Sequence, residues 1–97
     1  MEWRYLKTSS AEELANVTYF SMKKSQPEGT VRFHITVKEY AVPPEGQRLH
    51  FFAQADKQVN QHSAPLLPTG WGDTSSEALE GCLQLIRQFP YQGEDWS

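Results

Sequence analysis

Residues 70–90, with the sequence GWGDTSSEALEGCLQLIRQFP, decide the fold class of this 97-residue chain. The Thr74 side chain is placed to accept the Glu77 amide, while the Glu77 carboxylate can reach back to the Thr74 amide, which is a capping box at a helix N-terminus. Pro90 ends the helix. Between these signals, apolar residues recur at helical spacing at Ala78, Leu79, Cys82, Leu85, Ile86 and Phe89. We therefore predict an amphipathic helix from Ser75 to Phe89 that covers the apolar face of a sheet.

Two stretches upstream of this helix alternate between apolar and other residues, as half-buried strands do. The first contains Val31, Phe33, Ile35 and Val37, and the second contains Leu49, Phe51, Ala53 and Ala55. Residues 42–47 lie between them and hold two prolines and a glycine, which predicts a hairpin loop and antiparallel strands. Residues 64–70 are extended by their prolines and predict a short third strand or a lid.

The N-terminal quarter of the chain carries two conflicting signals. Ser10 and Glu13 have the spacing of a second capping box, followed by one helical side made of Ala11, Leu14, Ala15, Thr18 and Met22. The run from Val17 to Met22 is β-branched and aromatic, which favours a strand instead. We predict that the helix continues to about Lys23. Residues 1–7 predict a short edge strand or an arm whose aromatic side chains pack on the core.

Together these elements predict one α+β domain over residues 1–97: a small antiparallel sheet of three to four strands with two helices packed on one face. Residues 91–97 are acidic, and we expect this tail to be frayed unless Tyr91 or Trp96 docks. We expect mobility around Asn60, and the sequence leaves open whether residues 56–70 are ordered. The predicted core consists of Leu14, Phe33, Ile35, Val37, Leu49, Phe51, Ala53, Ala78, Leu79, Cys82, Leu85, Ile86 and Phe89.

Composition limits the classes of partner. The chain is 38% hydrophobic and 12% aromatic, which is enough for one modest core without a metal or a disulfide. Twelve acidic against nine basic side chains give a net charge of −3, which disfavours a nucleic-acid backbone as partner. No leader segment and no apolar run of about 20 residues occurs, and the single Cys82 lies on the apolar side of the predicted helix. We therefore predict a cytoplasmic protein with no membrane partner.

The histidine and serine side chains do not form a catalytic or metal-binding pattern. His34 and His50 are expected on the polar face of paired strands and His62 in a polar loop, whereas a zinc site needs three or four ligands. Ser75 and Ser76 are accounted for by helix capping. We therefore predict no enzyme, no catalytic residue, no metal and no cofactor.

The Gly70-Trp71-Gly72 segment opens the helix, as phosphate-binding loops do. It lacks a third glycine and a nearby basic residue, and the carboxylates of Asp73 and Glu77 would repel phosphate. We interpret the segment as a turn in which Trp71 covers the helix.

The Gly-x-Gly-Asp-Thr opening and Glu77-Ala78-Leu79 on the first helical turn carry a resemblance to a known family. With the order helix, strand, hairpin, strand, extended turn, helix, they resemble HicB-type antitoxins, which in turn resemble the double-stranded-RNA-binding fold. The likeness covers Gly72 to Leu79 and, by pattern, the two strands. The basic Lys-Lys-x-Ala-Lys helix start of double-stranded-RNA binders is replaced here by Ser75 to Leu79, and no C-terminal DNA-binding segment follows. The resemblance therefore implies a sheet-and-helix scaffold that binds a protein partner.

The favoured function is a non-enzymatic adaptor or regulatory module that binds a protein. Binding is expected through a self-associating strand edge or through the apolar loop from Pro65 to Trp71, with Leu66, Leu67 and Trp71 as the contact residues. The alternative is a nucleic-acid-binding module that uses the polar face of the sheet. In that alternative, Arg32 and Lys38 contact the phosphates.

Overall fold

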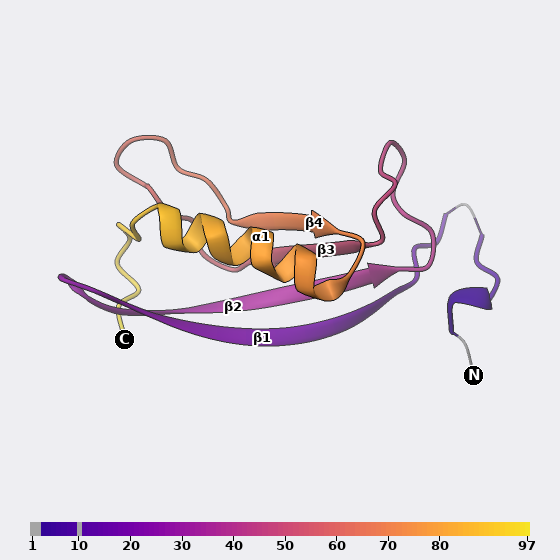
Figure 1. Ribbon diagram of the computed structural model, residues 1–97, viewed down its shortest axis with the longest axis horizontal. Coiled ribbons are helices and arrows are strands. Elements are labelled where there is room, and N and C mark those ends of the chain that lie inside the picture. The colour runs from indigo at the N-terminus through magenta and orange to yellow at the C-terminus, as the bar shows by residue number, and fades with distance from the viewer. Residues whose placement is uncertain (1–2, 10) are drawn as a thin grey trace.

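The computed structural model describes residues 3–9 and 11–97, which form one antiparallel sheet with an α-helix across one face (Figure 1). A short 3₁₀ helix, η1 (Trp3–Tyr5), precedes the sheet, and α1 (Ser75–Gln88) follows it. The four strands lie side by side in chain order: β1 (Ala15–Gln26), β2 (Gly29–Tyr40), β3 (Phe51–Ala55) and β4 (Thr69–Gly72). The predicted α+β class and antiparallel sheet are confirmed.

Helix α1 begins and ends where its local signals place it. The Thr74 Oγ1 accepts the Glu77 amide at 3.1 Å. The Glu77 carboxylate lies 3.4 Å from the Thr74 hydroxyl, so the return contact goes to the hydroxyl and not to the Thr74 amide. At the other end, the Phe89 amide donates to the Leu85 carbonyl at 3.1 Å, and Pro90 follows. The predicted helix is therefore confirmed to within one residue.

The predicted helix reaching Lys23 is wrong, and with it the prediction of two helices. Ala15–Gln26 form β1, whose 12 residues all pair with β2, from Ala15 opposite Tyr40 to Gln26 opposite Gly29. The β-branched and aromatic residues after Asn16 suit this pairing, which outweighs the helical spacing of the apolar residues. Ser10, the predicted cap, lies outside the described residues. Among the described residues α1 is the one α-helix.

The hairpin between β1 and β2 turns through Pro27 and Glu28. Gly29 begins β2 with a φ of +151°, a backbone conformation that favours glycine. A Cβ at this position would lie 3.4 Å from the Trp96 ring. Glycine therefore permits both the tight turn and the close approach of the C-terminal tail.

The core lies between α1 and the face of the sheet that α1 covers. From β2 and β3 it contains the buried side chains Val31, Phe33, Ile35, Val37, Ala53 and Ala55, and from α1 it contains Ala78, Cys82 and Ile86. Seven of the predicted core residues are thus buried. The other six, Leu14, Leu49, Phe51, Leu79, Leu85 and Phe89, are half-buried, and of these Phe51, Leu79 and Phe89 pack against the core.

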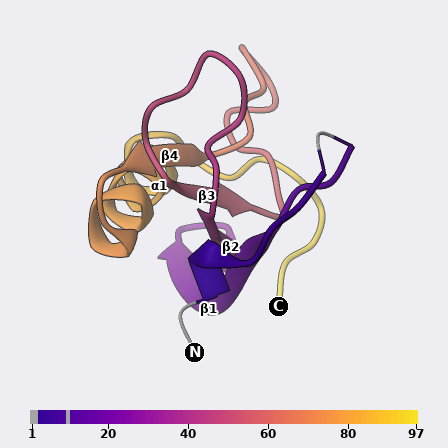
Figure 2. The same cartoon turned by 90° about the vertical axis from the view of Figure 1, so that its right-hand side faces the viewer.

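The helix approaches β4 closely because both elements carry glycine at the contact. A Cβ on Gly70 would lie 2.8 Å from the Cys82 nitrogen, and one on Gly81 would lie 3.3 Å from the Gly70 Cα. Glycine is required at Gly70 because a larger residue would push α1 away from β4. Figure 2 shows the result, with α1 beside β3 and β4 and away from β1.

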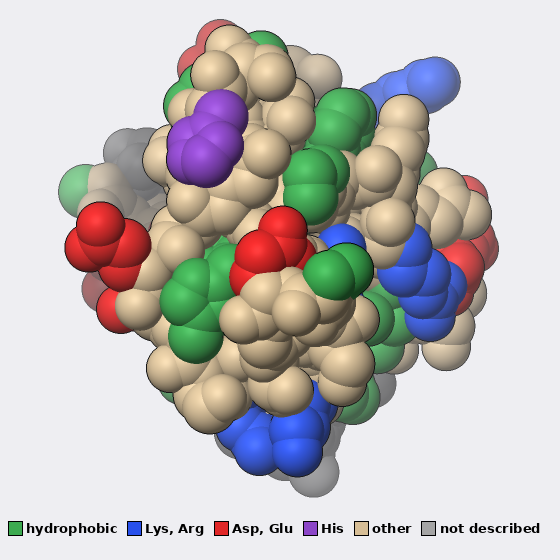
Figure 3. Space-filling model, turned by 90° about the vertical axis from the view of Figure 1, so that its left-hand side faces the viewer, with side chains coloured by type: hydrophobic (Ala, Val, Ile, Leu, Met, Phe, Trp, Pro, Cys, Tyr) green, Lys and Arg blue, Asp and Glu red, His purple; other side chains and the backbone are tan. Residues whose placement is uncertain are grey.

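Residues 56–70, whose order the sequence left open, are joined to the C-terminal tail by hydrogen bonds. The Asn60 amide donates to the Pro90 carbonyl at 2.8 Å, and the Gln92 amide donates to the Gln61 side chain at 2.7 Å. The His62 amide donates to the Gln92 side chain at 2.9 Å. Figure 3 views this end of the molecule and shows acidic and basic side chains interspersed on its surface.

The tail itself docks through the two aromatic residues considered for that role. Tyr91 is buried and packs edge-on against Phe33, with ring centroids 5.9 Å apart, and against Trp96 at 5.0 Å. The Ser97 amide donates to the Thr30 carbonyl at 2.7 Å. Residues 91–97 therefore close the end of the core that the helix does not reach.

The N-terminal arm differs from the predicted edge strand. Trp3–Tyr5 form η1, and the Arg4 guanidinium pairs with the Glu39 carboxylate near the end of β2. Met1 and Glu2, the first two residues of the predicted strand, lie outside the described residues.

Candidate binding surface

Strand β1 forms one edge of the sheet. In the sheet order it has β2 on one side, and none of the described residues pairs with its other side. Because α1 packs over β3 and β4 (Figure 1), residues 16–21 of β1 are exposed, whereas Met22 and Lys24 farther along the strand are half-buried. An edge strand of 12 residues with unpaired backbone groups is a ready template for a further strand.

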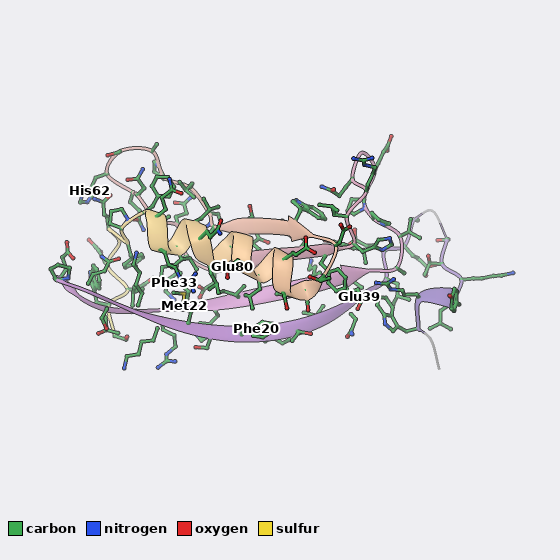
Figure 4. All side chains as sticks on the ribbon, viewed as in Figure 1. Phe20, Met22, Phe33, Glu39, His62 and Glu80 are labelled. Atoms are coloured by element: carbon green, nitrogen blue, oxygen red, sulfur yellow. The ribbon has the colours of Figure 1, made fainter. Side chains whose placement is uncertain are left out.

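Apolar side chains gather along this edge. Val17 is 37% exposed, Tyr19 is 77% exposed and Phe20 is 40% exposed. Phe20 and Met22 lie directly opposite Ile35 and Phe33 on β2, so they share the helix face of the sheet with these buried residues. Figure 4 labels Phe20 on β1, with Met22 and Phe33 nearer to α1. Burial of such side chains on binding is favourable by about 25 cal/mol per Å² of apolar surface.

A groove runs between β1 and α1. It has a volume of about 180 Å³ and is lined by Phe20, Ser21, Met22, Ile35, Leu79, Leu83 and Arg87. Five of these seven side chains are apolar, and the Arg87 guanidinium stands at its rim. The groove is therefore suited to apolar side chains from a segment that pairs with β1.

Lys24 ties the far end of β1 to the helix. Its ammonium donates to the Ile86 carbonyl at 2.6 Å and to the Phe89 carbonyl at 3.0 Å, both at the C-terminus of α1. A cation at this end also interacts favourably with the helix dipole. Burial lowers the pKa of Lys24. The contact fixes the hairpin against the C-terminal end of α1.

The opposite face of the sheet carries aromatic and basic side chains. Trp71 packs on Phe52, with ring centroids 4.5 Å apart, and stacks on Tyr40 at 6.1 Å. Burial, and secondarily the nearby Glu13 carboxylate, raise the pKa of Tyr40. Glu13 therefore lies on the Tyr40 side of the sheet, just before β1 begins.

The structure brings the two residues of the nucleic-acid alternative onto this same face. Arg32 is exposed and donates to the Ser21 hydroxyl at 3.0 Å across the hairpin. Lys38 is half-buried and lies opposite Val17 on β1 and Phe52 on β3. The two cations are six residues apart on β2, so they share a face but not a contact.

The three residues predicted for partner binding are separated by the fold. Leu66 packs against the core, and its backbone pairs with Val59. Leu67 is half-buried in the same loop. Trp71 lies on the outer face of the sheet in β4, so the loop from Pro65 does not present one continuous apolar surface.

The three histidines and the cysteine lie in different elements and loops. The His50 Nδ1 lies 2.8 Å from the Tyr40 carbonyl, and His34 uses its amide to bind the Asp56 carboxylate at 2.9 Å. His62 is exposed in its loop. Cys82 is buried, which raises the pKa of its thiol to about 11. Within residues 3–9 and 11–97, no three His, Cys, Asp or Glu side chains are grouped to hold a metal ion.

Sequence reasoning named a strand edge as a candidate but did not place it at β1. The signal for β1 was present in Val17-Thr18-Tyr19-Phe20, where two β-branched residues precede two aromatic ones. Such a run is favourable in a strand and unfavourable in a helix. The groove had no local signal, because its walls come from strands and a helix more than 40 residues apart in the chain.

Comparison with protein-family models, curated proteins and solved structures gave no match. The resemblance to HicB-type antitoxins stays a prediction. Of the helices in the part of the chain described here, none has the length and apolar character needed to cross a membrane.

Proposed function

We propose that this chain is a non-enzymatic binding module that holds a protein partner along the free edge of β1. A partner segment in extended conformation adds a strand to the sheet, and its alternate side chains enter the groove between β1 and α1. The single observation that carries this proposal is the exposed apolar edge: Val17, Tyr19 and Phe20 lie within four consecutive residues of a strand that, among the described residues, has a partner on one side only.

The edge of β1 is favoured over the predicted loop because the apolar side chains of the edge are exposed, whereas the leucines of the loop are half-buried. Leu66 and Leu67 are half-buried and Leu66 belongs to the margin of the core, so the loop would have to rearrange before it bound anything. Phe20 and Tyr19 are already exposed on a strand that β2 holds in place. A preformed surface loses less conformational entropy on binding.

The test is capture of partners from the native cell extract by the full chain, with mass spectrometry of what is retained. The double variant Phe20→Ser/Leu83→Ser removes apolar contacts from both walls of the groove. We expect it to retain at least tenfold less partner than the wild type, because one or two lost anchor residues change affinity by that factor. Circular dichroism checks that the variant is folded.

Two matched variants locate the binding surface. Val42→Ser changes an exposed apolar residue outside β1, 72% exposed, and we expect no loss of capture. Leu67→Ala/Trp71→Ala tests the loop. Capture that survives Phe20→Ser/Leu83→Ser but is lost in the loop variant would refute the edge and favour the loop.

A second candidate function is binding of single-stranded nucleic acid on the face opposite α1. Its specific support is the charge of that face: Lys23, Arg32 and Lys38 point outward from β1 and β2 around Tyr19, and none of the outward residues of the four strands is acidic. The nearby Asp56 carboxylate is engaged by Lys57 at 3.1 Å. Exposed aromatic rings among cations are typical of surfaces that stack bases and contact phosphates.

Fluorescence polarisation with a short labelled single-stranded oligonucleotide at two ionic strengths tests this candidate. Arg32→Gln/Lys38→Gln is expected to weaken binding about tenfold at low salt and to flatten its salt dependence. Arg48→Gln, an exposed cation outside the sheet, is the control. Absence of salt-dependent binding by the wild type removes this candidate.

A further inference from the structure

Strand β1 has opposite charges at its two ends. Glu12 and Glu13 lie just before it, with Leu14 between them and Ala15, and Lys23 and Lys24 lie near its C-terminal end. The Ala41 amide donates to the Leu14 carbonyl at 3.1 Å, so the extended path of β1 continues back to the residue that follows Glu13. An antiparallel copy of this strand therefore presents its acidic end to the basic end of the first.

We infer that the partner at this edge is a second copy of the chain, paired through β1 in antiparallel orientation with the twofold axis at Thr18. This inference rests on the proposed function, because it names the occupant of the same edge. The two sheets join into one across β1, with Thr18 of each copy opposite Thr18 of the other.

This register brings complementary side chains together at several positions of the strand, while Phe20 meets Asn16. On the face opposite α1, Val17 meets Tyr19 of the second copy, and Lys23 meets Glu13. On the helix face, Met22 meets Leu14. Aromatic pairs with β-branched residues, Thr pairs and opposite-charge pairs are the cross-strand contacts that stabilise antiparallel sheets. Every pair except Thr18 with Thr18, which lies on the axis, occurs twice because the axis is twofold.

Other arrangements of the two strands lose this match. Parallel pairing in register places Lys23 beside Lys23, and like charges directly opposite are destabilising. An axis at Tyr19 places Lys23 opposite Ala15 and leaves both acidic residues without a cation. Among antiparallel arrangements that keep both helices on one face of the joined sheet, the charges thus select this register.

The arrangement of the layers leaves room for the second copy. Helix α1 lies over β3 and β4, on the side of the sheet away from the β1 edge (Figure 2). A twofold axis perpendicular to the sheet puts both helices on the same face, with two β1 and two β2 strands between them. The two grooves, each lined by Phe20 and Leu83, then open toward the seam from either side.

Sedimentation equilibrium of the full chain measures the association. We expect a reversible dimer of twice the 11.1 kDa monomer mass. Lys23→Glu and Glu13→Lys should each weaken the dimer about tenfold or more, since each change converts two attractive pairs into two repulsive ones. The double variant Lys23→Glu/Glu13→Lys restores opposite charges and should recover most of the lost affinity. Arg48→Glu, an equal change of charge outside the sheet, should have no effect.

Cysteine cross-linking measures the register independently. The natural Cys82 is buried and is not expected to react in the folded protein. In the proposed register, Thr18→Cys places two thiols on directly opposed residues, with Cα atoms about 4.5–5.5 Å apart, within disulfide range. With diamide as oxidant, this variant should form covalent dimers at least tenfold faster than Tyr19→Cys, whose two copies are displaced along the strands. Gln84→Cys on the helix is the surface control.

The outcomes separate this inference from the proposed function. Rescue by the charge swap together with preferential cross-linking at Thr18 supports it. A monomer at all concentrations, or cross-linking that is faster at Tyr19 or Gln84, overturns it. If the chain is monomeric while Phe20→Ser/Leu83→Ser abolishes capture of a different protein, strand-edge binding stands and self-pairing falls. If none of these surfaces binds anything, both proposals fail.

Discussion

Phe33 and Phe20 lie on the same face of the same hairpin, yet Phe33 is fully buried and Phe20 is 40% exposed. The difference is the position of α1. The helix packs on β3 and β4 and reaches β2, where Phe33 is, but β1 extends beyond it (Figure 4). One half of the sheet is therefore a closed core, and the other half retains apolar surface that binding can still remove from water. The comparison shows that one helix of 14 residues covers only part of the face of a four-stranded sheet.

The largest loss of stability is expected where α1 packs most closely on β4. Gly70→Val should lower the free energy of unfolding by about 4 kcal/mol or more, or prevent folding, because its side chain meets the backbone of α1 near Cys82. Chemical denaturation measures the change. Gly46→Ala is the control: a Cβ there has nothing within 4 Å, and its φ of +82° costs about 1–2 kcal/mol. Equal losses in the two variants would contradict the close contact.

Substitution of Phe33 and of Phe20 tests directly whether β2 is covered by α1 while β1 is not. Phe33→Ala should cost about 3–5 kcal/mol, the range for a large buried aromatic residue. Phe20→Ala should cost about 1 kcal/mol or less, since much of the ring is already in water. Urea denaturation at dilute protein concentration measures both. A Phe20→Ala loss as large as that of Phe33→Ala would mean that β1 is covered in the monomer.

Lys24 links the two halves, and its removal should have an intermediate effect. Lys24→Met keeps the aliphatic stem but loses both hydrogen bonds to α1, so we expect a loss of about 1–2 kcal/mol. Lys23→Met, one residue away on the other face, should cost about 0.5 kcal/mol or less at dilute concentration. Indistinguishable stabilities of the two variants would show that Lys24 does not hold the hairpin to the helix.

The last effect is negligible at neutral pH, grows above pH 9 and reports on the covered half alone. The pKa of the Cys82 thiol is raised from its usual 9 to about 11, so above pH 9 the unfolded chain loses a proton that the folded chain keeps. Stability contributed by this group therefore falls as pH rises from 9 toward 11, by at most about 1.4 kcal/mol per pH unit. Cys82→Ala should show a flatter decline in the same denaturation series. Parallel curves for the two proteins would argue against burial of the thiol.

The sequence predicted the covered half far better than the edge, for a physical reason. Helix α1 is specified by local signals: Thr74 and Glu77 at its start, Pro90 after its end, and apolar spacing between them. The state of residues 15–26 is decided by pairing with β2, which local propensity does not contain, and the helical spacing of Leu14, Thr18 and Met22 was misleading. Docking of Tyr91 and burial of Val59 likewise depend on contacts with distant segments.

The candidate binding surface could likewise be predicted only in part. The sequence placed Arg32 and Lys38 on one polar strand face because alternation fixes which residues share a face. It did not reveal the groove, whose walls are joined only when the hairpin and α1 pack.

The most direct test of the account is residue-resolved amide hydrogen exchange by NMR at low protein concentration. If β1 is a strand with one free edge, its amides should alternate between slow and fast exchange, because every second one points away from β2. Amides of β2 within its β1-paired and β3-paired stretch should be slow throughout. Fast exchange along all of β1 would contradict the strand, and uninterrupted protection at low concentration would contradict the free edge on which the binding proposal depends.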